Sequence, residues 1–247
     1  MSSILITGCN RGLGLGLIKC FLKLSPSPQH IIATCRDPQQ AEELSSLAQQ
    51  HSNLHLLQID LKDVDRYEQF AAEVNSIVGD NGLNVLFNNA GVSPKSTRLN
   101  FVKSDDLVDT FLTNTVAPIM LTKTLTPLLK KAAEANASTP MGPRKACIIN
   151  MSSILGSIEA NTDGGLYAYR TSKSALNAAT KSMSIDLRSN QIMAVAMHPG
   201  WVRTDMGGSK APLAVEQSCE QMVQTVLSLG EKHNGGFLQY DGKELPW

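Results

Sequence analysis

A tyrosine and a lysine, Tyr169 and Lys173, stand four residues apart in the polar stretch 167–175. On a helix this spacing places a phenol and an ammonium on one face, one turn apart. A phenol titrates near pH ~10, and a fixed cation beside it favours the phenolate and lowers its pKa. The pair would therefore suit proton transfer in carbonyl or alcohol chemistry. The motif alone is common, and a chance meeting of two side chains on a helix surface would explain it as well.

A second tyrosine competes for this role. Tyr167 is followed four residues later by Thr171, which supplies no cation. The chemistry therefore favours Tyr169 as the proton donor.

The amino-terminal stretch predicts a nucleotide site. A short apolar run at 3–6 leads into the turn 7–14, which has glycine at 8, 12 and 14, and a helical pattern follows at 15–24. Glycines let the backbone approach a pyrophosphate, and the free N–H groups of a helix N-terminus can bind it. The spacing is Gly-x-x-x-Gly-x-Gly, which differs from the commoner Gly-x-Gly-x-x-Gly. A glycine turn in this position after the first strand indicates a dinucleotide site.

Strand and helix patterns alternate along the whole chain. This alternation predicts an α/β fold: one doubly wound, Rossmann-type parallel sheet of about seven strands with helices on both faces, forming a single domain over 1–247. Ligands of such sheets bind at the carboxyl ends of the strands. We expect strands near 3–7, 30–35, 54–59, 83–88, 145–151, 192–198 and 236–240, and helices near 13–24, 38–50, 64–79, 105–134, 167–189 and 215–230.

Composition narrows the class of protein. The 247 residues carry 22 basic and 22 acidic side chains, so neither nucleic acid nor a membrane is an expected partner. Five scattered cysteines with no Cys-x-x-Cys and no histidine cluster predict reduced thiols and no metal site. Together with the absence of a signal-peptide pattern, these features predict a cytoplasmic protein.

Six motifs follow one another over almost the whole chain. They are Thr7-Gly8-x-x-x-Gly12-x-Gly14, Asn88-Asn89-Ala90-Gly91, Asn114, Ser153, Tyr169-x-x-x-Lys173 and Pro199-Gly200. These motifs, in this order, resemble the short-chain dehydrogenase/reductase family. Within that family the stretch 199–208 and the ending 236–247 resemble sniffer-type carbonyl reductases, with a further similarity to bacterial C-factor proteins.

The resemblance implies a catalytic set of Asn114, Ser153, Tyr169 and Lys173. Tyr169 would protonate the carbonyl oxygen, Ser153 would hold that oxygen, Lys173 would lower the tyrosine pKa and bind the nicotinamide ribose, and Asn114 would hold a water near the lysine. The implied activity is NADPH-dependent reduction of aldehyde, ketone or quinone carbonyls. A nucleotide-binding signalling or sensor protein with little turnover is the alternative.

The cofactor site follows from the same resemblance, with NADP(H) as the cofactor. Cys35 stands where an NAD-binding protein would offer an acid to the ribose, and Arg36 and Arg11 could bind a 2′-phosphate instead. The Asp37 carboxylate could still bind the ribose hydroxyls of NAD, so NAD also stays a possible cofactor. The predicted cofactor-binding residues are Gly8, Asn10, Arg11, Gly12, Leu13, Gly14, Arg36, Asp60, Leu61, Asn88, Asn89, Ala90, Gly91, Tyr169, Lys173, Pro199, Gly200, Val202 and Thr204.

Other residues have competing interpretations. Asp60 could be an ordinary helix cap, the stretch 88–91 a tight turn, and His198 a core histidine. The natural substrate cannot be read. We expect an apolar substrate lining from Ile154, Leu155, Tyr167, Trp201, Met206, 207–214 and 93–101, and a weakly anchored lid over 204–213. Helices 105–134 and 167–189 resemble a dimerising pair, so a homodimer and a monomer both stay open.

Overall fold

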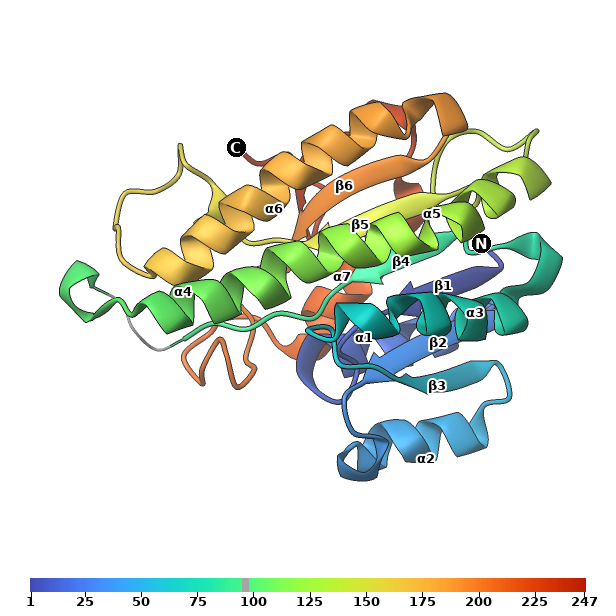
Figure 1. The fold of residues 1–247 in the computed structure, drawn as a ribbon, viewed down its shortest axis with the longest axis horizontal. Coiled ribbons are helices and arrows are strands. Elements are labelled where there is room, and N and C mark those ends of the chain that lie inside the picture. Colours follow the sequence, from blue (N-terminus) through green and yellow to red (C-terminus); the bar gives the residue numbers. More distant parts are fainter. Residues whose placement is uncertain (95–97) are drawn as a thin grey trace.

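The computed structural model describes residues 1–94 and 98–247, and all seven of its strands join one parallel sheet (Figure 1). The strand order is β3-β2-β1-β4-β5-β6-β7. The predicted fold class is confirmed, and each strand lies where the alternating pattern placed it, within two residues at its ends. The strands are β1 Ser3–Ile6, β2 His30–Cys35, β3 Leu54–Gln58, β4 Val85–Asn88, β5 Cys147–Met151, β6 Met193–His198 and β7 Phe237–Gln239.

The helices cover both faces of the sheet, and alternate strand residues face the two layers. On β1, Ile4 and Ile6 pack in one core with α1, α2 and α7, whereas Leu5 packs in the other core with α3 and α5. Figure 1 shows α5 and α6 crossing in front of the strands. The α-helices are α1 Gly12–Leu22, α2 Glu42–Gln50, α3 Tyr67–Val78, α4 Ser104–Phe111, α5 Ala117–Ala135, α6 Tyr167–Asp186 and α7 Val215–Ser228.

Coverage on both faces explains the strand composition. Every residue of β1, β4, β5 and β6 is buried. Strands buried on both faces read as continuous apolar runs rather than as alternating ones. This is why β6 could be predicted from an almost unbroken apolar run.

The strand order reverses between β1 and β4, which lie side by side with Ile4 opposite Val85. The connections from these two strands leave to opposite faces of the sheet, and such a reversal opens a crevice at the carboxyl ends of the strands. The segments that follow β1, β4, β5 and β6 all begin at this edge because the strands are parallel. The predicted motifs are therefore gathered at one edge of the sheet.

One predicted helix is interrupted. The stretch expected as a single helix over 105–134 consists of α4, a π-helical turn at Leu112–Val116, and α5. Pro118 lies near the start of α5 and has no N–H to donate to the carbonyl of Asn114 four residues earlier. The missing α-helical bond accounts for the wider turn at this point.

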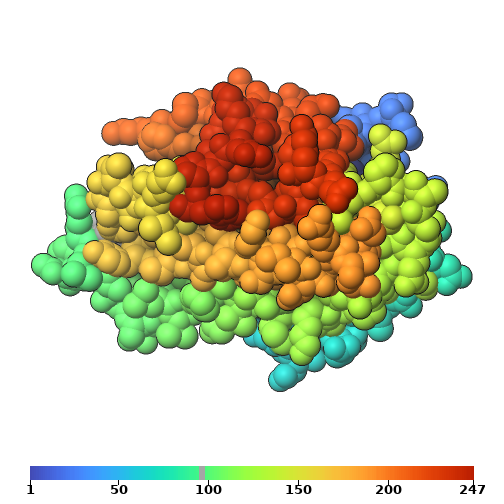
Figure 2. All heavy atoms as spheres, turned by 90° about the horizontal axis from the view of Figure 1, so that it is seen from above, coloured from blue at the N-terminus to red at the C-terminus, as the bar shows by residue number. Residues whose placement is uncertain are grey.

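The carboxyl-terminal residue lies against the segment that follows β5. The carbonyl oxygen of Trp247 accepts hydrogen bonds from Ile158 N and Glu159 N, both at 3.0 Å, and from Ser157 Oγ at 3.1 Å. The Trp247 ring stacks on Phe237 of β7 with 5.4 Å between the ring centroids. Figure 2 shows the last residues, in red, beside the yellow segment near residue 160.

Candidate active site

Helix α6 places Tyr169 and Lys173 at the carboxyl edge of the sheet. The Lys173 ammonium lies 5.7 Å from the centroid of the Tyr169 ring, as expected for side chains four residues apart on one helix face. Lys173 is almost fully buried, and its Nζ donates to the carbonyl oxygen of Met151 at 2.7 Å. The end of β5 therefore fixes the lysine.

Ser153 follows β5 and lies against Tyr169. The serine forms the N-terminal cap of a short 3-10 turn, Ile154–Gly156, where its Oγ accepts from Leu155 N at 3.2 Å. Its hydroxyl also hydrogen bonds to the phenol of Tyr169, and this bond lowers the tyrosine pKa. The structure thus brings Ser153, Tyr169 and Lys173 together.

The pKa of Tyr169 runs opposite to the prediction. Burial raises it to about 12, and the hydrogen bond from Ser153 opposes only part of that rise. The Lys173 ammonium donates to the Met151 carbonyl, and burial of the phenol decides the net direction of the shift in the Tyr169 pKa. Burial also lowers the pKa of Lys173 to about 8. The protein's own groups therefore keep the proton on the phenol at neutral pH.

Asn114 lies in the π-helical turn and is completely buried. Its Oδ1 accepts from Val92 N and its Nδ2 donates to Val92 O, both at 2.8 Å, and Nδ2 also donates to Ser172 Oγ at 3.0 Å. A Cβ atom on Gly91 would lie 3.3 Å from Asn114 Oδ1 and 3.5 Å from Lys173 Nζ. Asn114 and Lys173 therefore face the same small gap, although the Asn114 side chain is bonded to Val92.

The ends of β1 and β4 hold each other at the reversal of strand order. Thr7 Oγ1 accepts from Asn89 N and Ala90 N, both at 3.0 Å, and Asn89 Nδ2 donates to Thr7 O at 2.7 Å. A Cβ atom on Gly14 would lie only 2.2 Å from the carbonyl oxygen of Gly8. The glycine turn, which also contains Asn10, Gly12 and Leu13, is therefore closed to side chains at this point. Such a turn before helix α1 is a cradle suited to a pyrophosphate.

A second layer of polar groups lies beneath Asn88. Its Nδ2 donates to Asn150 Oδ1, and Asn150 Nδ2 donates to Thr180 Oγ1, both at 2.8 Å. Asn150 and Thr180 are fully buried. This chain of hydrogen bonds joins β4 and β5 to α6, the helix that carries Tyr169 and Lys173.

The end of β2 bears on the choice of nicotinamide. Both carboxylate oxygens of Asp37 have partners in the next turn, Gln39 N at 2.9 Å and Gln40 Nε2 at 2.8 Å. The Arg36 guanidinium makes no ion pair with any described residue, whereas Arg11 pairs with Asp205 at 2.7 Å. The acid that could have favoured a ribose 2′-hydroxyl is thus engaged elsewhere.

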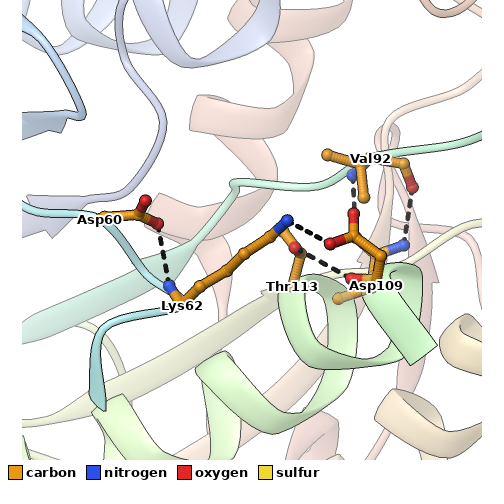
Figure 3. A network of polar contacts seen from close by, with 6 residues as sticks. Asp60, Lys62, Val92, Asp109 and Thr113 are labelled. Atoms are coloured by element: carbon orange, nitrogen blue, oxygen red, sulfur yellow. Dashed lines mark hydrogen bonds and ion pairs between the residues drawn. The ribbon is translucent and has the colours of Figure 1, made fainter. Parts of the chain in front are cut away.

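Asp60 and Leu61 follow β3 near helix α4. Asp60 Oδ1 accepts from Lys62 N at 3.0 Å, and the Lys62 ammonium pairs with Asp109 (Figure 3). Figure 3 also shows Val92 beside this helix, with both of its backbone polar atoms bonded. Asp60 caps a turn and not a helix, since Asp63 stands at the N-cap of the next helical segment, Val64–Arg66. The plainer interpretation of Asp60 as a helix cap is therefore wrong, and its contact with a cofactor stays a prediction.

The segment after β6 is anchored at its two ends. It contains Pro199, Gly200, Val202 and Thr204 of the predicted cofactor set, and Val202 pairs with Leu213 in a short parallel bridge. Within 204–213 the buried residue is Ala211, and Met206 is 52% exposed. The expected weak apolar anchoring therefore fits the middle of this segment, and the cofactor-dependent lid stays a prediction.

His198, at the end of β6, fits the interpretation as a core histidine. It is buried, its Nδ1 has no hydrogen-bond partner among the described residues, and burial lowers its pKa to about 4. The ring is therefore neutral near pH 7.

A cavity of about 520 Å³ opens beside the start of α6. It is lined by part of the predicted substrate wall, and its lining does not include Tyr169. Residues 95–97 of the predicted 93–101 wall lie outside the described residues. The lining residues are Arg98, Leu99, Asn100, Phe101, Gly164, Gly165 and Tyr167.

Several partners had no direct signal in the sequence. Val92 and Met151 act through backbone atoms, which any residue type provides. Ser172 and Pro118 could have been found, the first from its place beside Lys173 and the second from its spacing of four residues from Asn114.

No cluster of three potential metal ligands occurs in residues 1–94 and 98–247, and none of the helices described there has the length and hydropathy to span a bilayer. All five cysteines are free thiols, four of them buried, and burial raises the pKa of every one.

Comparisons with known proteins agree with this geometry. The family model of short chain dehydrogenases matches residues 2–213. The carbonyl reductase Sniffer of D. melanogaster is 63% identical with a TM-score of 0.99, and each chain is covered completely. An NADPH-bound carbonyl reductase from chicken fatty liver is 39% identical with a TM-score of 0.94, covering 100% of this chain and 99% of its own. The C-signal protein of Myxococcus xanthus is 41% identical over 165 residues, covering 67% of this chain and 93% of its own.

Proposed function

The chain belongs to the short-chain dehydrogenase family, and from this premise we propose that it is an NADPH-dependent carbonyl reductase with Tyr169 as its general acid. The observation that carries the proposal is the meeting of Ser153, Tyr169 and Lys173 at the carboxyl edge of the sheet. The carbonyl reductases among its structural relatives support the reaction class.

The residues present fit a nicotinamide cofactor. Gly8 and Gly14 let the turn pack tightly on its own backbone and on the end of β4, and the N-terminus of α1, whose N–H groups could bind a pyrophosphate, follows it. Arg36 and Arg11 would hold the 2′-phosphate, because guanidinium groups bind phosphate oxygens in pairs. When bound, a reduced nicotinamide supplies hydride to a carbonyl carbon.

The protein's own groups supply the proton. Because the pKa of Tyr169 is raised to about 12, the phenol is protonated at neutral pH and can donate to the oxygen that gains charge. Ser153 would hold that oxygen with its hydroxyl. Lys173, with a pKa of about 8, is mainly a cation near pH 7 and would stabilise the tyrosinate left behind.

The substrate class is the finer part of the proposal. The cavity beside α6 is lined by Leu99, Phe101 and Tyr167 together with the polar side chains of Arg98 and Asn100. Its aliphatic and aromatic side chains favour aldehydes, ketones and quinones with an apolar body, and Arg98 and Asn100 would accept polar groups on them. We treat residues 1–247 as one NADP-binding domain, since all seven strands join one sheet. The homodimer stays a prediction.

The test compares turnover of NADPH by the wild type, Tyr169→Phe and Tyr167→Phe with a panel of aldehydes, quinones and diketones. Tyr169→Phe should lose about 10²–10⁴-fold in turnover, the usual effect of removing a general acid. NADPH affinity should stay nearly unchanged. Tyr167→Phe is the matched control and should remain active. Loss of activity in the control with retention in Tyr169→Phe would contradict the assignment.

A second candidate function is a nucleotide-binding signalling protein with little turnover. The 41% identity to the C-signal protein favours it. Tight binding of NADPH without oxidation of it by any member of the panel would support this function over the first.

A further inference from the structure

The loop that follows β6 presents one acidic side chain at a fixed place. Trp201 Nε1 donates to Gly207 O at 2.8 Å, and Gly207 N donates to Thr204 Oγ1 at 3.0 Å. A Cβ atom on Gly207 would lie 2.0 Å from Val202 O, so the turn closes tightly on itself. Asp205 stands within this turn, which fixes the place of its backbone.

The carboxylate of Asp205 lies on the glycine turn. Asp205 Oδ2 is 2.7 Å from Arg11 Nη1, although the two residues are 194 positions apart. The neighbouring contact is close as well, since Thr204 Cγ2 would lie 3.6 Å from a Cβ atom on Gly12. Two adjacent residues of the loop thus meet two adjacent residues of the turn.

No other described cation pairs with Asp205. Arg203, two residues earlier, donates to the carbonyls of Ala211 and Pro212 at 3.1 and 2.8 Å, and so is engaged within the loop. Arg11 is therefore the partner that holds Asp205, and the pair is exposed, with 71% and 75% of the two side chains accessible.

We propose that Asp205 is a specificity-determining residue, whose carboxylate competes with the 2′-phosphate of NADP(H) for Arg11. The inference rests on the proposed function. A phosphate that binds Arg11 carries up to two negative charges. These charges come close to the Asp205 carboxylate, which forms an ion pair with the same guanidinium. Asp205 then either gives up Arg11 or shares it with the phosphate at the cost of charge repulsion. A cofactor with a free 2′-hydroxyl brings no charge to Arg11, so Asp205 weakens the binding of NADP(H) and not that of NAD(H).

The competition also connects the loop to the glycine turn. Arg11 holds Asp205 when no phosphate binds it, and a phosphate that takes Arg11 removes the ion pair between the loop and the turn. The bonds within the loop, from Trp201 to Gly207 and from Arg203 to Pro212, are independent of Arg11. Phosphate binding should therefore detach the loop from the turn without unfolding it.

The experiment measures the affinity of the full-length chain for NADP⁺ and for NAD⁺ by calorimetry, in the wild type, Asp205→Asn, Arg11→Ala and the double variant. Asp205→Asn should bind NADP⁺ roughly two- to five-fold more tightly, the range expected for an exposed ion pair. Its affinity for NAD⁺ should not change. In the Arg11→Ala background the same substitution should lose most of its effect.

Asp80→Asn is the matched control. Asp80 forms an exposed ion pair with Lys131 at 3.0 Å, and it precedes β4, at the opposite edge of the sheet from the glycine turn. The Asp80→Asn substitution removes one negative charge, as Asp205→Asn does, but far from the site. It should therefore leave the affinities for NADP⁺ and NAD⁺ unchanged.

Three results would overturn the inference: equal tightening toward both cofactors, weaker NADP⁺ binding by Asp205→Asn, or a full effect in the Arg11→Ala background. A wild-type chain that prefers NAD⁺ would instead refute the proposed cofactor. The two failures are therefore distinguishable in one set of titrations.

Discussion

Replacing Asn150 with leucine tests whether the buried chain of hydrogen bonds beneath the site holds α6 to the sheet. Leucine is close to asparagine in size and removes the bond accepted from Asn88, the bond donated to Thr180 and the weak 3.7 Å bond donated to Met183 Sδ. Asn88 Nδ2 would keep only its 3.3 Å contact with Thr122. Thr180 would lose an accepted bond but would still donate to Leu176 O at 2.7 Å.

The expected loss follows from these partners. Each net hydrogen bond contributes about 0.5–1.5 kcal/mol, and a buried donor left poorly paired costs about 1–3 kcal/mol. Together they predict a fall of about 3 kcal/mol in the free energy of unfolding. With a urea m-value near ~3 kcal/mol/M, the midpoint of unfolding should fall by about 1 M.

The double variant Asn88→Leu/Asn150→Leu provides the control. It removes the Asn88 side-chain donor as well as its acceptor on Asn150. Replacing both partners of a buried hydrogen bond by apolar groups of similar shape can be nearly neutral for stability. It should therefore be more stable than Asn150→Leu alone. An unchanged urea midpoint in the single variant, or a double variant that shows the full sum of both losses, would refute this reasoning.

Two further perturbations test the site's surroundings. Burial lowers the pKa of His198 to about 4, so the unfolded chain binds a proton at this histidine before the folded chain does. The free energy of unfolding should therefore fall by about 3 kcal/mol as the pH falls from about 6.5 through 4. In urea unfolding measured over this pH range, His198→Leu should show a weaker pH dependence, and an unaltered dependence would contradict a buried neutral ring. Pro118→Ala restores an N–H that can donate to the carbonyl of Asn114, so it should favour a regular α-helix and displace Asn114 from Val92. Turnover should then fall more than thermal stability. An unchanged kcat with a raised Tm would show that the π-helical turn has no part in the reaction.

The sequence predicted the fold well because parallel strands covered on both faces leave long apolar runs. The spacing of Tyr169 and Lys173 and the family resemblance of Ser153 also pointed to three residues that the structure brings together. The sequence could not predict the pKa of Tyr169, because that value depends mainly on burial of the phenol in the folded chain. The pairing of Arg11 with Asp205 was equally out of reach, since no periodicity relates residues 194 positions apart.

The five cysteines have a consequence for the chemical durability of the protein. Reactive aldehydes and quinones alkylate thiolates, and the thiolate is the form of cysteine that attacks them. Burial raises the pKa of Cys9, Cys20, Cys35, Cys147 and Cys219, and leaves only Cys20 in partial contact with solvent. An enzyme that reduces such electrophiles would therefore meet them with its own nucleophilic sulfur atoms protonated and largely covered, so that its working lifetime would not be limited by reaction with its substrates.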